Sequence, residues 1–109
     1  MIQISSEAIE SLKLALSEFE EYRPDPIVVL SLFEHRSKIL LEDGRLFRRY
    51  VLGQPHAVIF PARATRGYAE TERTEIGGLR FIVAPLEFRR QRIEVAIFEG
   101  ELVADTAVT

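Results

Sequence analysis

The chain has 109 residues, of which 47% are hydrophobic and 28% charged, and its formal net charge is −3. This length and composition are typical of one globular domain, residues 1–109, and they exclude an intrinsically disordered chain. No basic leader with an apolar stretch opens the sequence, and no apolar run approaches the roughly 20 residues of a membrane span, so we expect a cytoplasmic protein without a membrane segment.

The sequence contains no cysteine. Disulfides, thiolate nucleophiles, zinc fingers and cysteine-bound iron–sulfur clusters are therefore excluded. There is also no Gly-x-Ser-x-Gly elbow and no glycine-rich phosphate loop, so neither a serine nucleophile in its usual setting nor a nucleotide cradle is predicted. We expect no resident cofactor.

Charge is distributed unevenly along the chain. The net charge is −4 over residues 1–26, +6 over 45–92 and −4 over 93–109, and twelve of the fourteen basic residues are arginine. Either the arginines pair with the acidic segments, within the fold or across a dimer, or they form an anion or nucleic-acid patch. The sequence pI of 5.4 favours internal pairing over nucleic-acid binding. The candidates for anion or partner contacts are Arg45, Arg48, Arg49, Arg89, Arg90 and Arg92.

The first part of the chain predicts a short strand followed by a helix. Residues 2–4 alternate as a strand does, and Ser5 is a suitable N-cap. Apolar residues then recur at three- and four-residue intervals over 8–19, which predicts an amphipathic helix over residues 5–21. Pro24 marks its end, because a residue that precedes proline avoids the helical conformation.

From residue 27 the pattern changes to that of strands. Residues 27–33 are apolar and β-branched, which predicts a buried strand. Asp43–Gly44 is a strong signal for a two-residue hairpin turn. Two apolar pairs and one pair of opposite charge support the register that this turn sets. The register pairs Glu42 with Arg45, Leu41 with Leu46 and Leu40 with Phe47.

The rest of the chain predicts further short strands and an α+β fold. Strand patterns cover residues 45–52, 57–60, 74–76, 79–84 and 93–98, and Gly77–Gly78 joins the third of these to the fourth as a second hairpin. Residues 62–73 are predicted as a loop, 86–92 as a helical turn, and the residues after Gly100 as a frayed end. We expect one N-terminal helix packed on six or seven mostly antiparallel strands, in a curled sheet or a small open β-barrel. Apolar strands in such a fold leave an edge that a second copy of the chain could cover.

His35 and His56 are the only histidines, and Glu34 directly precedes the first of them. Glu34 and His35 are therefore weak candidates for a metal site. Neighbouring residues on a strand point to opposite faces and do not chelate together unless they lie in a turn. The histidines also lack the spacing of metal ligands, so we expect no metal site and predict that both are exposed loop residues.

Two blocks of the sequence together are similar to segments of a known family. Ile2-x-Ile4-Ser5-x-x-Ala8-x-x-x-Leu12 combines a strand, a cap and a helix, and residues 75–85 form a hairpin in which glycine precedes an apolar strand. With the apolar strand after the proline-containing loop and the strand over 93–98, these blocks resemble the A-type iron–sulfur carrier (HesB/IscA-like) family. The resemblance implies a HesB-like α+β fold.

The same resemblance implies no site residues. The family binds iron or a cluster through three cysteines, and this chain has none of them. Glu34-His35-Arg36-Ser37 stands where a cysteine-containing turn is expected, and the tail lacks Cys-Gly-Cys. A chain without thiolates cannot hold a cluster by that chemistry.

The sequence thus favours a non-enzymatic HesB-like domain without an iron–sulfur cluster site, acting as a binding or scaffold protein for an unknown protein partner. One alternative is a small-ligand or metal-binding protein that reuses the family pocket with His35 and Glu34. Another is a nucleic-acid-associated protein that uses the arginine-rich middle, where Phe47 stands beside Arg48 and Arg49. The predicted hairpin pairs Phe47 with an apolar residue, which favours a place in the core.

Overall fold

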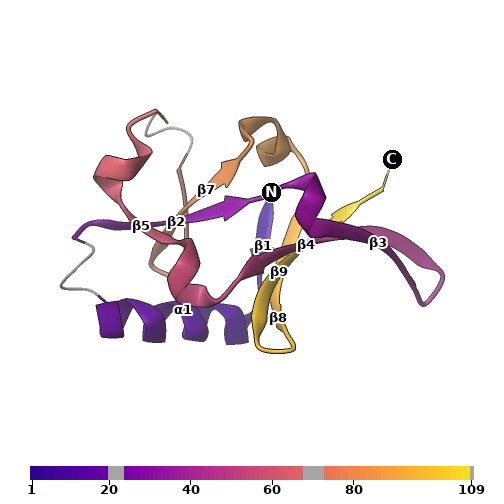
Figure 1. The fold of residues 1–109 in the computed structure, drawn as a ribbon, viewed down its shortest axis with the longest axis horizontal. Helices are drawn as coiled ribbons and strands as arrows, with labels where there is room; N and C mark the ends of the chain where they lie inside the picture. Colours follow the sequence, from indigo (N-terminus) through magenta and orange to yellow (C-terminus); the bar gives the residue numbers. More distant parts are fainter. Residues whose placement is uncertain (20–23, 68–72, 109) are drawn as a thin grey trace.

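The computed structural model describes residues 1–19, 24–67 and 73–108. In these residues the chain forms one α-helix and nine β-strands in two sheets, which confirms the α+β class (Figure 1). Neither sheet closes into a barrel. Across the five-stranded sheet the order is β1 (Ile2–Ile4), β8 (Ile93–Phe98), β9 (Glu101–Ala107), β4 (Arg45–Gly53) and β3 (Ser37–Glu42). Across the four-stranded sheet it is β5 (Ile59–Pro61), β2 (Pro26–Ser31), β7 (Leu79–Ala84) and β6 (Thr74–Ile76).

Helix α1 (Ser6–Phe19) begins at the predicted cap. The Ala8 N–H donates to Ser5 Oγ at 3.1 Å, and the Ile9 N–H donates to the Ser5 carbonyl at 3.0 Å. The first bond satisfies one of the backbone donors that a helix leaves unpaired at its start, and the second is the first hydrogen bond of the helix itself. Residues 20 and 21, the predicted end of the helix, lie outside the described residues.

One core joins the helix to both sheets. Alternate residues of β2, β7, β4, β8 and β9 point inward, and one face of α1 covers them. The parallel pairing of β1 with β8 and of β2 with β7 brings together strands that are far apart in the sequence, and the other pairings are antiparallel. The fully buried side chains include Leu12, Ile27, Leu30, Phe81, Ile82, Ile93 and Leu102.

Both predicted hairpins are present. The turn at Asp43–Gly44 has positive φ at both residues, 51° and 73°, which is what a tight turn between twisted strands requires. The register is the predicted one, with Glu42 opposite Arg45. The other predicted pairs are confirmed as well: Leu41 with Leu46, Leu40 with Phe47, and, across the Gly77–Gly78 turn, Ile76 with Leu79.

The prediction of a frayed end after Gly100 was wrong. Glu99 and Gly100 have φ values of 51° and 82° and form a third tight turn, which starts β9. Strand β9 lies between β8 and β4 and pairs with both along its length. Its apolar run, Leu102–Ala104, is buried, because a strand inside a sheet is covered by its neighbours and by the core.

Short 3₁₀ turns replace parts of other predicted elements. Ala57 and Val58 belong to η3 (Pro55–Val58) rather than to a strand, since Pro55 starts the turn. The predicted strand over 27–33 ends at Ser31, and η2 (Glu34–Arg36) follows. The predicted loop over 62–73 begins with η4 (Ala62–Thr65), and its residues 68–72 lie outside the described ranges. None of the helices in the described ranges could cross a membrane.

The position of β9 predicts a large cost for shortening Leu102. Leu102 is fully buried, so Leu102→Ala should lower the free energy of unfolding by about 2–5 kcal/mol. Leu14→Ala is the matched control, because Leu14 is 62% exposed and its loss should cost less than about 0.5 kcal/mol. Urea denaturation measures both, and a frayed segment after Gly100 would give equal, small effects.

Candidate functional site

The outer face of the five-stranded sheet carries an arginine bound to a carboxylate. Arg49 on β4 lies opposite Asp105 on β9, and its Nε and Nη2 donate to the two carboxylate oxygens at 2.8 and 2.9 Å. The guanidinium also lies over the rings of Phe47 and Phe98, at 5.2 and 4.7 Å from their centroids. The hydrogen bond to Asp105 raises the pKa of Arg49 against the opposing effect of burial, and the charges of Asp105 and Glu42 add to the rise.

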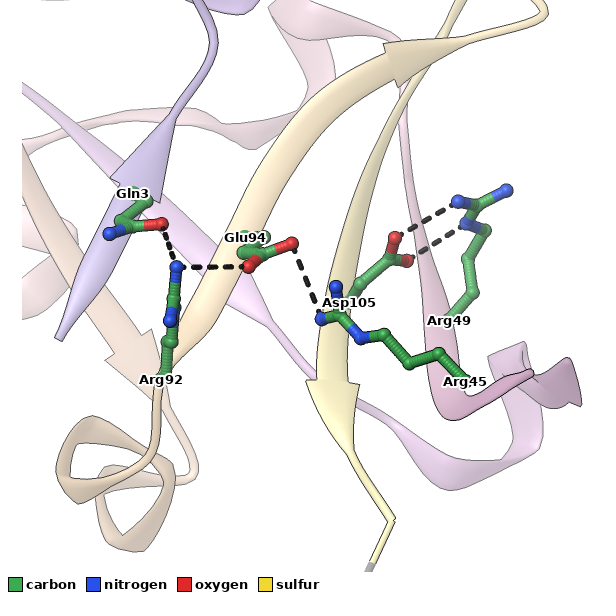
Figure 2. Close-up of polar contacts among 6 residues, drawn as sticks. All are labelled: Gln3, Arg45, Arg49, Arg92, Glu94 and Asp105. Carbon is green, nitrogen blue, oxygen red and sulfur yellow. Dashed lines mark hydrogen bonds and ion pairs between the residues drawn. The ribbon is translucent and has the colours of Figure 1, made fainter. Parts of the chain in front are cut away.

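A second group of charges continues across the same face (Figure 2). Glu94 on β8 forms two ion pairs, with Arg45 Nη2 at 3.6 Å and with Arg92 Nη2 at 3.4 Å. The Arg92 guanidinium also donates to Gln3 Oε1 on β1 at 2.8 Å. The arginine side chains of these two ion pairs are exposed, so each pair contributes little to stability. Together the two pairs place a carboxylate beside the positive charges of both Arg45 and Arg92.

Three of the six candidate arginines are therefore engaged inside the fold: Arg45, Arg49 and Arg92 bind carboxylates of residues 93–109. Arg80 likewise pairs with Asp25 of the acidic N-terminal segment. These contacts correspond to the internal-pairing interpretation of the charge asymmetry. They leave the outer face with mixed charge, and Phe47 is buried there, so this face does not favour nucleic acid.

Arg48 has a different environment from its neighbour Arg49. Side chains alternate along a strand, so Arg48 and Tyr50 lie on the face opposite Arg49. Arg48 Nη1 donates to Ser37 Oγ at 2.9 Å, and Ser37 Oγ in turn donates to the Glu34 carbonyl at 2.7 Å. In the described ranges no carboxylate lies within ion-pair distance of Arg48, which leaves most of its donors available.

The Arg48 side chain lines a surface groove, which we call the Arg48 groove. Its volume is about 800 Å³. Three segments far apart in sequence meet here: the end of β2 with η2, the inner face of β4, and the turn after β7. The groove is lined by Leu32, Phe33, Glu34, His35, Arg48, Tyr50, Pro85, Glu87 and Phe88.

Both weak metal candidates lie in this groove. Glu34 and His35 belong to η2, a turn rather than a strand, so their side chains can share one site. The His35 ring stacks on Phe33 with centroids 5.6 Å apart and an interplanar angle of 17°. Over residues 1–19, 24–67 and 73–108, no group of three histidine, aspartate or glutamate side chains is placed to hold a metal ion. His56 is exposed in η3 and is separated by about 20 residues of sequence from Glu34 and His35.

Two smaller hollows adjoin the Arg48 groove. The first, of about 410 Å³, shares Phe33 and Pro85 with the groove and is mainly apolar; we call it the apolar hollow. The second, of about 230 Å³, shares Arg48, Tyr50 and Phe88 with the groove. The apolar hollow is lined by Val29, Ser31, Phe33, Phe60, Ala64, Thr65, Ala84 and Pro85.

The remaining two candidate arginines directly follow Phe88, a residue of the groove lining, in the sequence. Arg89 and Arg90 belong to η6 (Leu86–Arg90), within the predicted helical turn. The Arg90 side chain is exposed, and the Arg89 side chain lies outside what the structure describes. Phe88 of the same turn packs edge-on against Tyr50, with centroids 5.8 Å apart.

Sequence reasoning missed the aromatic and hydroxyl residues of the groove. Tyr50 and Phe88 line the groove with their rings in contact, and Ser37 accepts a hydrogen bond from Arg48. The alternation along β4 carried a signal for Tyr50, because it predicts that Arg48 and Tyr50 share a face. For Phe88 and Ser37 there was no such signal, since their neighbours come from distant segments.

No family model, no curated protein and no solved structure matches this chain. The resemblance to the HesB/IscA-like family therefore stays a prediction.

The contact between Arg49 and Asp105 predicts a specific stability effect. Asp105→Asn removes the charge that receives two hydrogen bonds and leaves a partly buried guanidinium without its partner, so unfolding should become easier by about 1–3 kcal/mol. Glu101→Gln on the same strand is the control and should change stability by less than about 0.5 kcal/mol. Equal effects of the two substitutions in thermal denaturation would contradict a role for the pair.

Proposed function

We propose that this chain is a non-enzymatic, cytoplasmic binding protein whose Arg48 groove takes a small organic carboxylate. The observation that carries the proposal is the contrast between neighbouring arginines. Arg49 is bound to Asp105, whereas Arg48 faces a groove and donates only to a hydroxyl within the described residues. A guanidinium held in this way offers a paired set of donors that matches a carboxylate.

The charge of the groove favours a monoanion. Glu34 and Glu87 line the groove together with Arg48, so a doubly charged phosphate would face two carboxylates for one guanidinium. A carboxylate carries a single charge and can accept two hydrogen bonds from Arg48.

The shape of the surface favours a ligand with an apolar body. The apolar hollow shares Phe33 and Pro85 with the Arg48 groove, so a ligand bound by the guanidinium would have apolar surface beside it for its own apolar part. Its walls offer the rings of Phe33 and Phe60. Binding sites commonly combine apolar walls with a few placed polar groups.

The side chains of the groove support binding rather than catalysis. The one histidine in the groove, His35, stacks on Phe33, and in the described residues no hydroxyl or carboxylate hydrogen bonds to it as a base would require. Glu34 and Glu87 are exposed, which is unlike the desolvated position of a general acid.

Binding can be tested with three probes: 3-phenylpropionate, the uncharged 3-phenylpropanol of nearly the same shape, and inorganic phosphate, an anion without an apolar group. We expect 3-phenylpropionate to shift the backbone amide signals of residues 33–35, 48 and 88 in two-dimensional NMR titrations. The alcohol lacks the negative charge and phosphate lacks the apolar phenylpropyl group, so each should bind at least about tenfold more weakly than 3-phenylpropionate. Equal responses to all three probes would contradict the proposal.

The role of Arg48 can be tested with a matched arginine on the same strand. Arg48→Gln should weaken 3-phenylpropionate binding about tenfold or more, because it removes a charge-assisted pair of hydrogen bonds. Arg45→Gln should leave binding unchanged, since Arg45 lies on the outer face beside Glu94. Undiminished binding by the Arg48 variant would reject the proposed site.

A further inference from the structure

The outer edge of strand β3, at one end of the five-stranded sheet, is a second surface, separate from the Arg48 groove. Strand β3 pairs with β4 on one side, and in the described residues no strand covers its other side. The hairpin of β3 and β4 projects at one end of the molecule's 44 Å long axis (Figure 1). Ile39, Leu41 and the neighbouring Leu46 are 50%, 69% and 51% exposed. A long apolar edge of this kind is a template for pairing with another strand.

The hairpin geometry determines which backbone groups of β3 are free. In a hairpin with a two-residue turn, the residues that flank the turn exchange both of their hydrogen bonds, and such pairs alternate along the strands. Glu42 flanks the turn, so Glu42, Leu40 and Lys38 direct their N–H and C=O groups toward β4. Ile39 and Leu41 therefore present theirs at the free edge.

A second copy of β3 fits this edge in an antiparallel register. With a twofold axis at Leu40, Ile39 lies opposite the partner's Leu41, so the free backbone groups of both strands meet and the exposed apolar side chains pair. Leu40 then lies opposite the partner's Leu40 as a pair without backbone hydrogen bonds. Lys38 lies opposite the partner's Glu42, which joins opposite charges on both sides of the axis.

Charge selects this register over its neighbours. Lys38 and Glu42 are exposed and make no ion pair within the described ranges, and Lys38 lies opposite Arg49, a like charge that is already bound to Asp105. Moving the twofold axis to Ile39 or Leu41 would put Lys38 or Glu42 opposite Leu40. Only the axis at Leu40 gives both charges a partner.

We propose that a second copy of this chain pairs with β3 through this twofold register and forms a homodimer with one sheet continuous across both copies. The proposal does not rest on ligand binding in the Arg48 groove. It places Ile39, Leu41 and Leu46 of the two copies together on one face of the joined sheet, where their apolar surface is removed from water.

Two charge variants and their mixture test the register. Lys38→Glu puts two acidic residues opposite each other and Glu42→Lys puts two basic ones, so each variant alone should dimerise about tenfold more weakly than the natural chain. In an equal mixture, each residue meets an opposite charge, and a heterodimer should form about as tightly as the natural dimer. Sedimentation equilibrium over a range of concentrations measures all four samples.

The outcomes are distinct. Weak self-association of each variant with restored association in the mixture supports the proposal, and the recovery also shows that both variants fold. A natural chain that stays monomeric up to millimolar concentration overturns it. Association that is unchanged in the single variants, or absent from the mixture, overturns the register.

A cysteine at the twofold axis gives an independent measurement. In this cysteine-free chain, Leu40→Cys would place two thiols in a pair whose Cα atoms are about 4.5 Å apart, within reach of a disulfide. Mild oxidation should then produce a covalent dimer in good yield. Leu14→Cys, on the exposed side of α1, is the control and should form far less. Equal yields from both positions would overturn the proposal.

Discussion

The fold depends on one strand, β9, lying between β8 and β4. It pairs with both neighbours, and its inward residues Leu102 and Ala104 complete the core beneath helix α1. Its outward residue Asp105 binds Arg49 and so joins β9 to β4 by side chains as well as by backbone. Because β4 carries Arg48 and Tyr50, the position of the groove follows from the position of β9.

The alternation of side chains on β4 separates two arginines that are adjacent in sequence. Arg49 points to the outer face, where Asp105 and two aromatic rings surround it. Arg48 points the other way, toward η2 and η6, and is held by a hydroxyl rather than a carboxylate. The Asp105 carboxylate thus binds the Arg49 guanidinium, whereas most donors of Arg48 stay available. The amino-acid composition alone does not distinguish these two arginines. A strand can in this way direct one arginine into an ion pair and its neighbour toward a groove.

The predictions that held were those that depend on neighbouring residues. The Asp43–Gly44 turn fixes its own register, and the cap at Ser5 needs only the first turn of the helix. Strand β9 was missed because Glu99–Gly100 is a weaker turn signal than Asp-Gly, and a short apolar run after it resembles a tail. The Arg48 groove could not be predicted as a whole, since residues 32–35, 48–50 and 85–88 meet only once the parallel pairing of β2 with β7 is made.

The central place of β9 has a consequence for how the chain folds during synthesis. The hairpin of β3 and β4 closes locally and can form early, and so can the hairpin of β6 and β7. Strands β4 and β8 have no common neighbour until residues 101–107 leave the ribosome, so two apolar strand borders stay open during that interval. Contacts such as Arg49 with Asp105 span 56 positions of sequence and form late. A nascent chain of this protein is thus exposed to mispairing with other chains until its ninth strand is released.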